Sequence, residues 1–110
     1  MMTDIRIFQP VRILSAASAG DLTHWVRSQL KAGARYFVID LKQVLFMDSS
    51  GLGCLILAQR MVTQVGGVLA LCSLSGQARM LLEMANTEQM IPVYDSVEDF
   101  ENSLKLTAQA

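Results

Sequence analysis

YFVIDL, at residues 36–41, is an unbroken run of apolar and β-forming side chains with a single charge at Asp40. A run of this kind is typical of a strand that is covered on both faces, because neither face has to meet water. We therefore expect a buried strand here, with other elements packed on both sides of it.

Helices and strands are expected to alternate on either side of this run. Apolar residues at helical spacing predict a helix over residues 19–32, with Ser18 as its N-cap and Gly33 as its stop. Apolar runs predict strands at residues 5–9, 11–14, 68–72 and 90–94, and capping residues predict further helices at residues 49–65, 75–85 and 97–104. Pro10 separates the first two strands, which we expect to form an edge hairpin. This alternation indicates βαβ units, so the expected fold class is α/β, with four or five strands.

The composition limits the possible classes of protein. The chain has 110 residues, which predicts a single domain over residues 1–110 with a frayed tail at residues 105–110. A hydrophobic content of 52% with 17% charged residues argues against disorder. No apolar run approaches the roughly 20 residues of a membrane span, and no signal peptide is recognisable, so we expect a cytoplasmic protein. The net charge of −1 and the lack of a basic cluster predict no nucleic-acid binding. Cys54 and Cys72, in apolar surroundings, are expected to be reduced core residues.

The segment DSSGLG, at residues 48–53, is the best candidate for a functional site. It lies where the chain is expected to enter a helix, and the backbone N–H groups at a helix start favour negative charge. Ser49 or Ser50 can cap this helix. Gly51 and Gly53 keep its first turn free of large side chains, so that another chain could approach closely. Each glycine costs about 1 kcal/mol in a helix, which suggests a compensating reason. An ordinary helix capped by Asp48 or a serine, with no further role, is also compatible with this segment.

The helix that follows this segment suggests a docking patch. On a helical wheel one apolar stripe is expected to face the core, and it consists of Cys54, Leu57, Ala58, Met61 and Val65. Leu52 and Ile56 fall instead among polar residues, close to the serines. Exposed apolar side chains beside a polar cap are typical of a docking surface, although isolated ones are also common on proteins with no partner.

The ten residues VLFMDSSGLG, at residues 44–53, resemble the signature of STAS-domain anti-sigma factor antagonists. The later segments at residues 66–75 and 94–96 agree with this resemblance. It implies a STAS fold, with a four- to five-stranded mixed sheet and about four helices packed against it. It also implies that a partner anti-sigma factor serine kinase phosphorylates one serine and that a metal-dependent serine phosphatase removes the phosphate. The implied acceptor is Ser49, directly after the aspartate, with Ser50 as the fallback.

The same resemblance suggests roles for the residues around the acceptor. Asp48 and Gly51 would support the acceptor site. The expected partner-binding residues are Leu52, Gly53, Ile56, Ser15, Ser18 and Ser75. Where the family usually carries Gly-Glu-Leu-Asp, this chain has RILS at residues 12–15, a departure that bears on which partner it binds. We expect a monomer that needs no cofactor or metal.

Two other classes of function compete with this one. An enzyme is disfavoured, because the only histidine, His24, is expected on the solvent face of a helix, and neither a nucleophile elbow nor a phosphate-binding loop is present. The second alternative is a non-phosphorylated STAS scaffold, an interaction subunit of a sensor, transport or lipid-trafficking assembly. In that case the serines are caps, and binding would not respond to phosphate.

Overall fold

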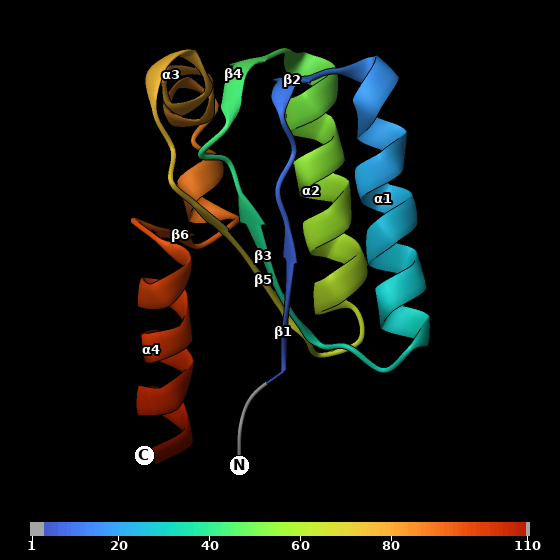
Figure 1. Cartoon of the computed structure of the whole chain (residues 1–110), viewed down its shortest axis with the longest axis vertical. Coiled ribbons are helices and arrows are strands. Elements are labelled where there is room, and N and C mark those ends of the chain that lie inside the picture. The colour runs from blue at the N-terminus through green and yellow to red at the C-terminus, as the bar shows by residue number, and fades with distance from the viewer. Residues whose placement is uncertain (1–3, 110) are drawn as a thin grey trace.

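The computed structural model describes residues 4–109, and within them strands and helices alternate as the sequence predicts (Figure 1). The strands are β1 (Ile5–Phe8), β2 (Arg12–Leu14), β3 (Tyr36–Asp40), β4 (Val44–Met47), β5 (Val68–Cys72) and β6 (Val93–Tyr94). The helices are α1 (Ala16–Lys31), α2 (Ser49–Thr63), α3 (Gly76–Met84) and α4 (Val97–Gln109), with a short 3-10 helix, η1 (Thr87–Gln89). Among the described helices none is both long enough and apolar enough to cross a membrane. The α/β class and the four helices are confirmed.

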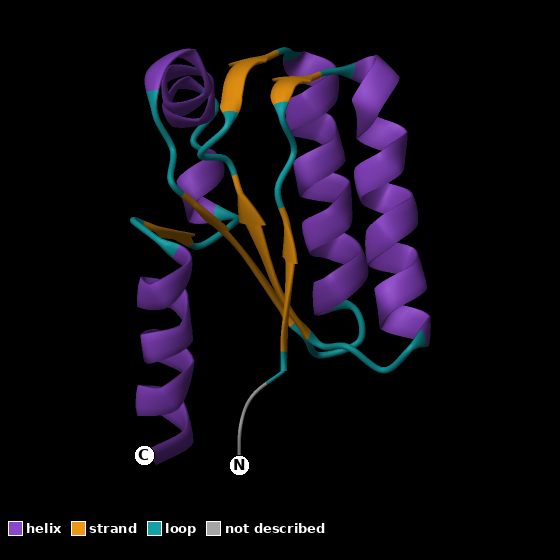
Figure 2. Cartoon of the chain, in the orientation of Figure 1, coloured by secondary structure: helices purple, strands orange, loops and turns teal. Residues whose placement is uncertain are grey.

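The strands form two sheets (Figure 2). The larger sheet has the order β1-β3-β5-β6, and the smaller one pairs β2 with β4. Every pairing among the described strands is parallel. The prediction of a mixed sheet is therefore wrong. Helices α1, α2 and α3 share the main hydrophobic core with one face of the sheet, and α4 covers the other face (Figure 1).

The predicted central strand is confirmed. Phe37, Val38 and Ile39 of β3 are each fully buried. Phe37 and Ile39 belong to the core beneath α1, α2 and α3, whereas Val38 belongs to the core beneath α4. A strand with apolar side chains on both faces is therefore covered by helices on both faces.

The prediction that the first two strands form a hairpin is wrong. β1 pairs with β3, and β2 pairs with β4, so the chain keeps its direction through the buried Pro10 instead of turning back. Strand β4 was not expected as a separate element. A turn in which the Val44 N–H donates to the Leu41 carbonyl, 3.1 Å away, separates it from β3.

Three helix boundaries and the last strand differ from the predictions by two residues or more. Helix α1 begins at Ala16 with Ser15 as its N-cap, and Ser18 lies inside the first turn, where its Oγ accepts the Ser15 N–H at 3.0 Å. Helix α2 ends at Thr63, slightly before the expected residue 65. Helix α4 continues to Gln109, beyond the expected end at Leu104, because no glycine or proline interrupts it there. Residue 110 of the expected tail lies outside the described residues. The last strand is reduced to Val93–Tyr94, because Pro92 lacks the N–H that a longer ladder needs.

The core face of α2 differs from the expected stripe. Its buried residues are Gly51, Cys54, Leu55, Ala58 and Val62. Leu57 and Val65 are each 48% exposed, whereas Leu52 and Ile56 are half-buried and pack against the core. The helix is therefore rotated relative to the expectation, with Leu55 and Val62 in the core in place of Leu57 and Val65.

Candidate functional site

The junction between β4 and α2 places the DSSG segment at one end of the molecule. Figure 1 shows the starts of α1 and α2, and also α3, at this same end of the molecule. In an open sheet of parallel strands, the loops that follow the carboxyl ends of the strands form the usual binding region. The candidate residues from three loops therefore lie at one end of the fold.

Asp48 is the N-cap of α2. Its backbone is extended, with φ −110°, and its Oδ1 accepts the backbone N–H of Gly51 at 3.0 Å. Its own N–H lies 3.4 Å from the Leu14 carbonyl, which ties the loop to β2. The cap is therefore Asp48, and the prediction that Ser49 or Ser50 caps the helix is wrong, because both serines lie inside the first helical turn.

Ser49 and Ser50 are both exposed. They occupy the first two positions of α2, where the helix macrodipole favours negative charge. Both hydroxyl groups are thus within reach of another molecule, and a charge added there would lie at the favourable end of a helix of 15 residues.

The two glycines of the first turn have different surroundings. Gly51 is buried, and a Cβ atom at this position would collide with the Leu14 carbonyl and lie 2.9 Å from Cγ of Met47. Gly53 is exposed and has no atom within 4 Å of such a Cβ. The expectation that Gly51 leaves room for another protein is therefore wrong, since its space is taken by β2 of the same chain. Only Gly53 leaves the outer surface of the turn open.

The other predicted partner-binding residues lie around this junction and differ in how exposed they are. Ser15 and Ser18 are half-buried at the start of α1, and the Ser18 Oγ also donates to the Ile13 carbonyl at 3.0 Å. Leu52 and Ile56 are half-buried on α2. Ser75 is exposed and is the N-cap of α3.

Gln77 of α3 belongs to this junction although the sequence did not single it out. Its Oε1 accepts the Met47 N–H, and its Nε2 donates to the Met47 carbonyl, both at 2.8 Å. Met47 and Gln77 are 30 residues apart in the chain. No local sequence signal could have revealed this contact, because it depends on how α3 packs against β4.

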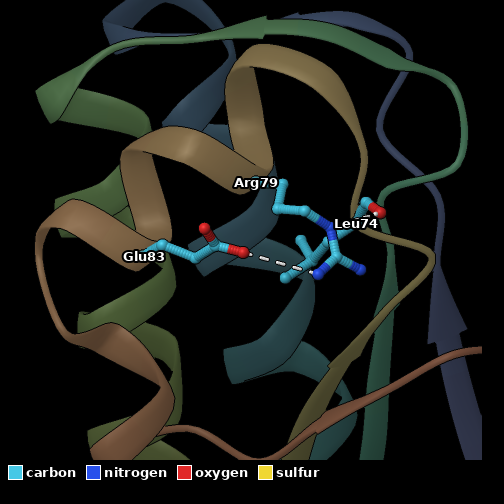
Figure 3. Close-up of polar contacts among 3 residues, drawn as sticks. All are labelled: Leu74, Arg79 and Glu83. Carbon is cyan, nitrogen blue, oxygen red and sulfur yellow. Dashed lines mark hydrogen bonds and ion pairs between the residues drawn. The ribbon is translucent and has the colours of Figure 1, made fainter.

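Arg79 fixes the beginning of α3 (Figure 3). Its Nε donates to the Leu74 carbonyl at 3.2 Å, and its Nη1 lies 3.5 Å from Oε1 of Glu83. The ion pair with Glu83 is about half exposed and contributes little, as is usual for surface pairs. The bond to Leu74 ties the helix to the loop before it, so Gln77 projects from an anchored helix.

The Cys54 thiol, on the buried side of α2, has a raised pKa. Desolvation by burial raises the pKa of the Cys54 thiol to about 11, although a backbone hydrogen bond involving Thr23 partly offsets this. A thiol with such a pKa is protonated at neutral pH and is a poor nucleophile. Cys54 and Cys72 are both buried and form no disulfide, as the sequence predicts. Among the described residues, no group of three or more His, Cys, Asp or Glu side chains could hold a metal ion.

The sequence is similar to known proteins of one family. The STAS domain family model matches residues 2–100. The chain is also 31% identical over 93 residues to the anti-sigma F factor antagonist of Paenibacillus polymyxa, which covers 76% of this chain and 80% of that protein. The fold is thus a STAS domain, and the chain belongs to the family of STAS-domain anti-sigma factor antagonists.

Solved structures agree with this fold. The NMR structure of protein TM1081, from Thermotoga maritima, has a TM-score of 0.84 at 23% identity and covers 96% of this chain and 85% of that one. The anti-sigma factor antagonist SpoIIAA in its unphosphorylated form has a TM-score of 0.71 at 18% identity, covering 100% of this chain and 94% of that one. The phosphorylated form of SpoIIAA from Bacillus has the same TM-score at 16% identity, covering 92% of each chain.

Proposed function

We propose that this protein is a phosphorylation-controlled partner switch in which Ser49 accepts the phosphate. The unphosphorylated chain binds an anti-sigma factor that is also a serine kinase, and the phosphorylated chain is released. A metal-dependent serine phosphatase then restores the binding form. The observation that carries this proposal is an exposed hydroxyl in the first turn of α2, directly after the Asp48 cap. Ser50, which is equally exposed, is the second candidate acceptor.

The relatives support this proposal through what their names state. The relative from Paenibacillus polymyxa is an antagonist of an anti-sigma factor. SpoIIAA has been solved both without and with phosphate. In our proposal this chain is the phosphoacceptor and not the enzyme, so ATP is bound by the partner.

Electrostatics explain how one phosphate could control binding. A phosphoserine carries about −1.5 to −2 charges at pH 7. On the free protein this charge lies at the start of α2, where the helix macrodipole favours it, and it remains in contact with water. In the complex the partner would cover the charge and hold it near the Asp48 carboxylate, where desolvation is costly. A tenfold loss of affinity requires only about 1.4 kcal/mol.

The proposed contact surface is centred on Ser49. The open surface at Gly53 lets a partner approach the helix closely, and the half-buried Leu52 and Ile56 contribute the apolar part of the contact. Ser15, Ser18 and Ser75 form its polar border. Apart from Asp48, the groups named here around the acceptor are neutral, so a phosphate on Ser49 would be the main electrostatic change at the interface.

The test is phosphate mapping. The wild type, Ser49→Ala and Ser50→Ala are incubated with Mg-ATP and, one at a time, each anti-sigma kinase encoded by the host. Mass spectrometry should find one phosphate on Ser49 in the wild type and in Ser50→Ala, and none in Ser49→Ala. Absence of phosphate from both serines with every kinase would falsify the switch and would favour a constitutive STAS scaffold.

A further inference from the structure

We infer that Gln77 is a positioning residue for the acceptor serine, an inference that rests on the proposed function of Ser49. Its side-chain amide bonds both polar backbone groups of Met47, with N···O distances of 2.8 Å for each bond. Met47 is fully buried and ends β4, and only the Asp48 cap separates it from Ser49.

The side-chain amide of Gln77 makes the hydrogen bonds that a second neighbouring strand would otherwise make with β4 at Met47. In the smaller sheet β4 has one strand neighbour, β2. In a parallel pair, alternate residues direct their N–H and carbonyl groups to opposite sides, and at Met47 both groups point to Gln77 of α3. Backbone groups at a buried strand end need partners, and an amide supplies one donor and one acceptor. Gln77 thus completes the hydrogen bonding of the residue that precedes the acceptor segment.

The acceptor segment is consequently held from two sides. On one side the Asp48 N–H meets the Leu14 carbonyl of β2, and Gly51 packs against the same carbonyl. On the other side Gln77 holds Met47 from α3. Phosphate transfer depends strongly on the placement of the attacking hydroxyl, because small errors in position cost rate rather than binding. Loosening one of the two supports should therefore slow transfer to Ser49 more than it weakens docking of the kinase.

The amide of glutamine is the only feature of residue 77 that this role requires. Gln77→Met keeps the length of the side chain and removes both hydrogen bonds. Gln77→Glu keeps the acceptor and, when ionised, loses the donor. Gln59 offers a matched control, because this half-buried glutamine of α2 donates to the Met90 carbonyl at 2.9 Å, far along the helix from the acceptor. Gln59→Met removes a similar bond without touching β4.

The first measurement needs no partner. Amide hydrogen exchange, followed by NMR, should be about tenfold faster at Met47 in Gln77→Met than in the wild type, because a protecting hydrogen bond is lost. In Gln59→Met the Met47 amide should exchange as in the wild type. Unchanged exchange at Met47 in Gln77→Met would overturn the structural basis of the inference.

The second measurement is the rate at which the host anti-sigma kinase transfers phosphate to Ser49. With Gln77→Met and Gln77→Glu as substrates, kcat should fall about tenfold or more while KM changes less than about twofold, and Gln59→Met should match the wild type. If Gln77→Met does not fold, Gln77→Glu provides the same comparison. If the wild type is phosphorylated and the Gln77 variants have the same kcat as the wild type, the positioning role alone is overturned. A wild type that accepts no phosphate overturns the proposed function and this role with it.

Discussion

The backbone carbonyl of Leu14 lies against Gly51 at a distance that leaves no room for a side chain at residue 51. Strand β2 and helix α2 therefore meet backbone to backbone beneath the first turn of the helix. The same carbonyl also faces the Asp48 N–H, so it contacts both the cap and the turn that presents Ser49. This close packing explains why a residue that is unfavourable in helices stands at position 51.

Replacing Gly51 should therefore destabilise the fold. Gly51→Ala should lower the free energy of unfolding by about 1 to 3 kcal/mol, because the new methyl group must displace the backbone of β2. Gly53→Ala is the matched control: it adds the same atom to open surface and should raise the free energy of unfolding by up to about 1 kcal/mol. Urea unfolding measures both values. Equal effects of the two substitutions would contradict the packing described here.

Removing the cap of α2 should have a smaller effect. Asp48→Ala should cost about 1 kcal/mol of folding stability, because the Gly51 N–H loses its acceptor. Asp48→Asn should retain most of this stability, since an amide oxygen can accept the same bond. Thermal and urea unfolding of the two variants, compared with the wild type, check the prediction. If the asparagine variant proved as unstable as the alanine variant, the stabilisation would come from the charge and not from the hydrogen bond.

The elements that could be predicted well are those determined by residues close together in the chain. The strand β5 at Val68–Cys72 has the predicted bounds, because a buried apolar run is visible without knowing its neighbours. The start of α3 at Gly76 follows from the capping residue Ser75 in the same way. The pairing of β1 was missed, because its partner β3 lies about thirty residues away along the chain, and nothing near Pro10 distinguishes a hairpin from a continuing strand.

At the candidate site, the position of the DSSG segment at a helix start could be predicted from the sequence, whereas its surroundings could not. The DSSG motif and the exposure of Ser49 follow from a helix start next to a strand. The orientation of α2 does not follow from the sequence, because a helical wheel cannot show that Leu55 is buried while Leu57 is exposed. The role of Gln77 depends on a contact with Met47 that forms only when the chain is folded.

The two buried thiols predict how the protein responds to alkali. Burial is the main cause that raises the pKa of the Cys54 thiol and of the Cys72 thiol from 9.0 to about 11, and nearby Asp40 adds to the shift at Cys72. The pKa is thus higher in the folded than in the unfolded protein. The neutral thiols contribute stability that is fully present below pH 9, and this stability should be lost as the pH rises toward 11.

Two measurements check this prediction about the thiols. Alkylation by iodoacetamide at pH 8 should be slow in buffer and should accelerate in urea in step with unfolding, because the reagent needs an exposed thiolate. The free energy of unfolding should fall between pH 9 and pH 11. The fall should be smaller in Cys54→Ala and in Cys72→Ala, and the part that remains in these variants comes from other groups that titrate in this range. Rapid alkylation of the native protein would show that the thiols are more accessible than the structure indicates.

A negative charge at residue 49 should weaken partner binding without harming the fold. Ser49→Asp should reduce the affinity for the host anti-sigma kinase at least tenfold, because the carboxylate would be covered beside Asp48 in the complex. Ser49→Ala should bind like the wild type, since it adds no charge. Titration calorimetry with the purified kinase measures all three affinities.

The stability of the same variants separates a switch from a structural defect. An acidic side chain in the first turn of α2 interacts favourably with the helix macrodipole by about 0.3 to 1 kcal/mol, so the Tm of Ser49→Asp should stay level or rise by a few degrees. Ser50→Asp is the matched control, because it places the same charge one residue further along the exposed turn and tests whether position matters. A large drop in Tm with unchanged affinity in Ser49→Asp would mean that residue 49 supports the helix instead of controlling binding. Equal losses of affinity in both aspartate variants would mean that the partner senses charge across the whole turn, and the assignment to Ser49 alone would then fail.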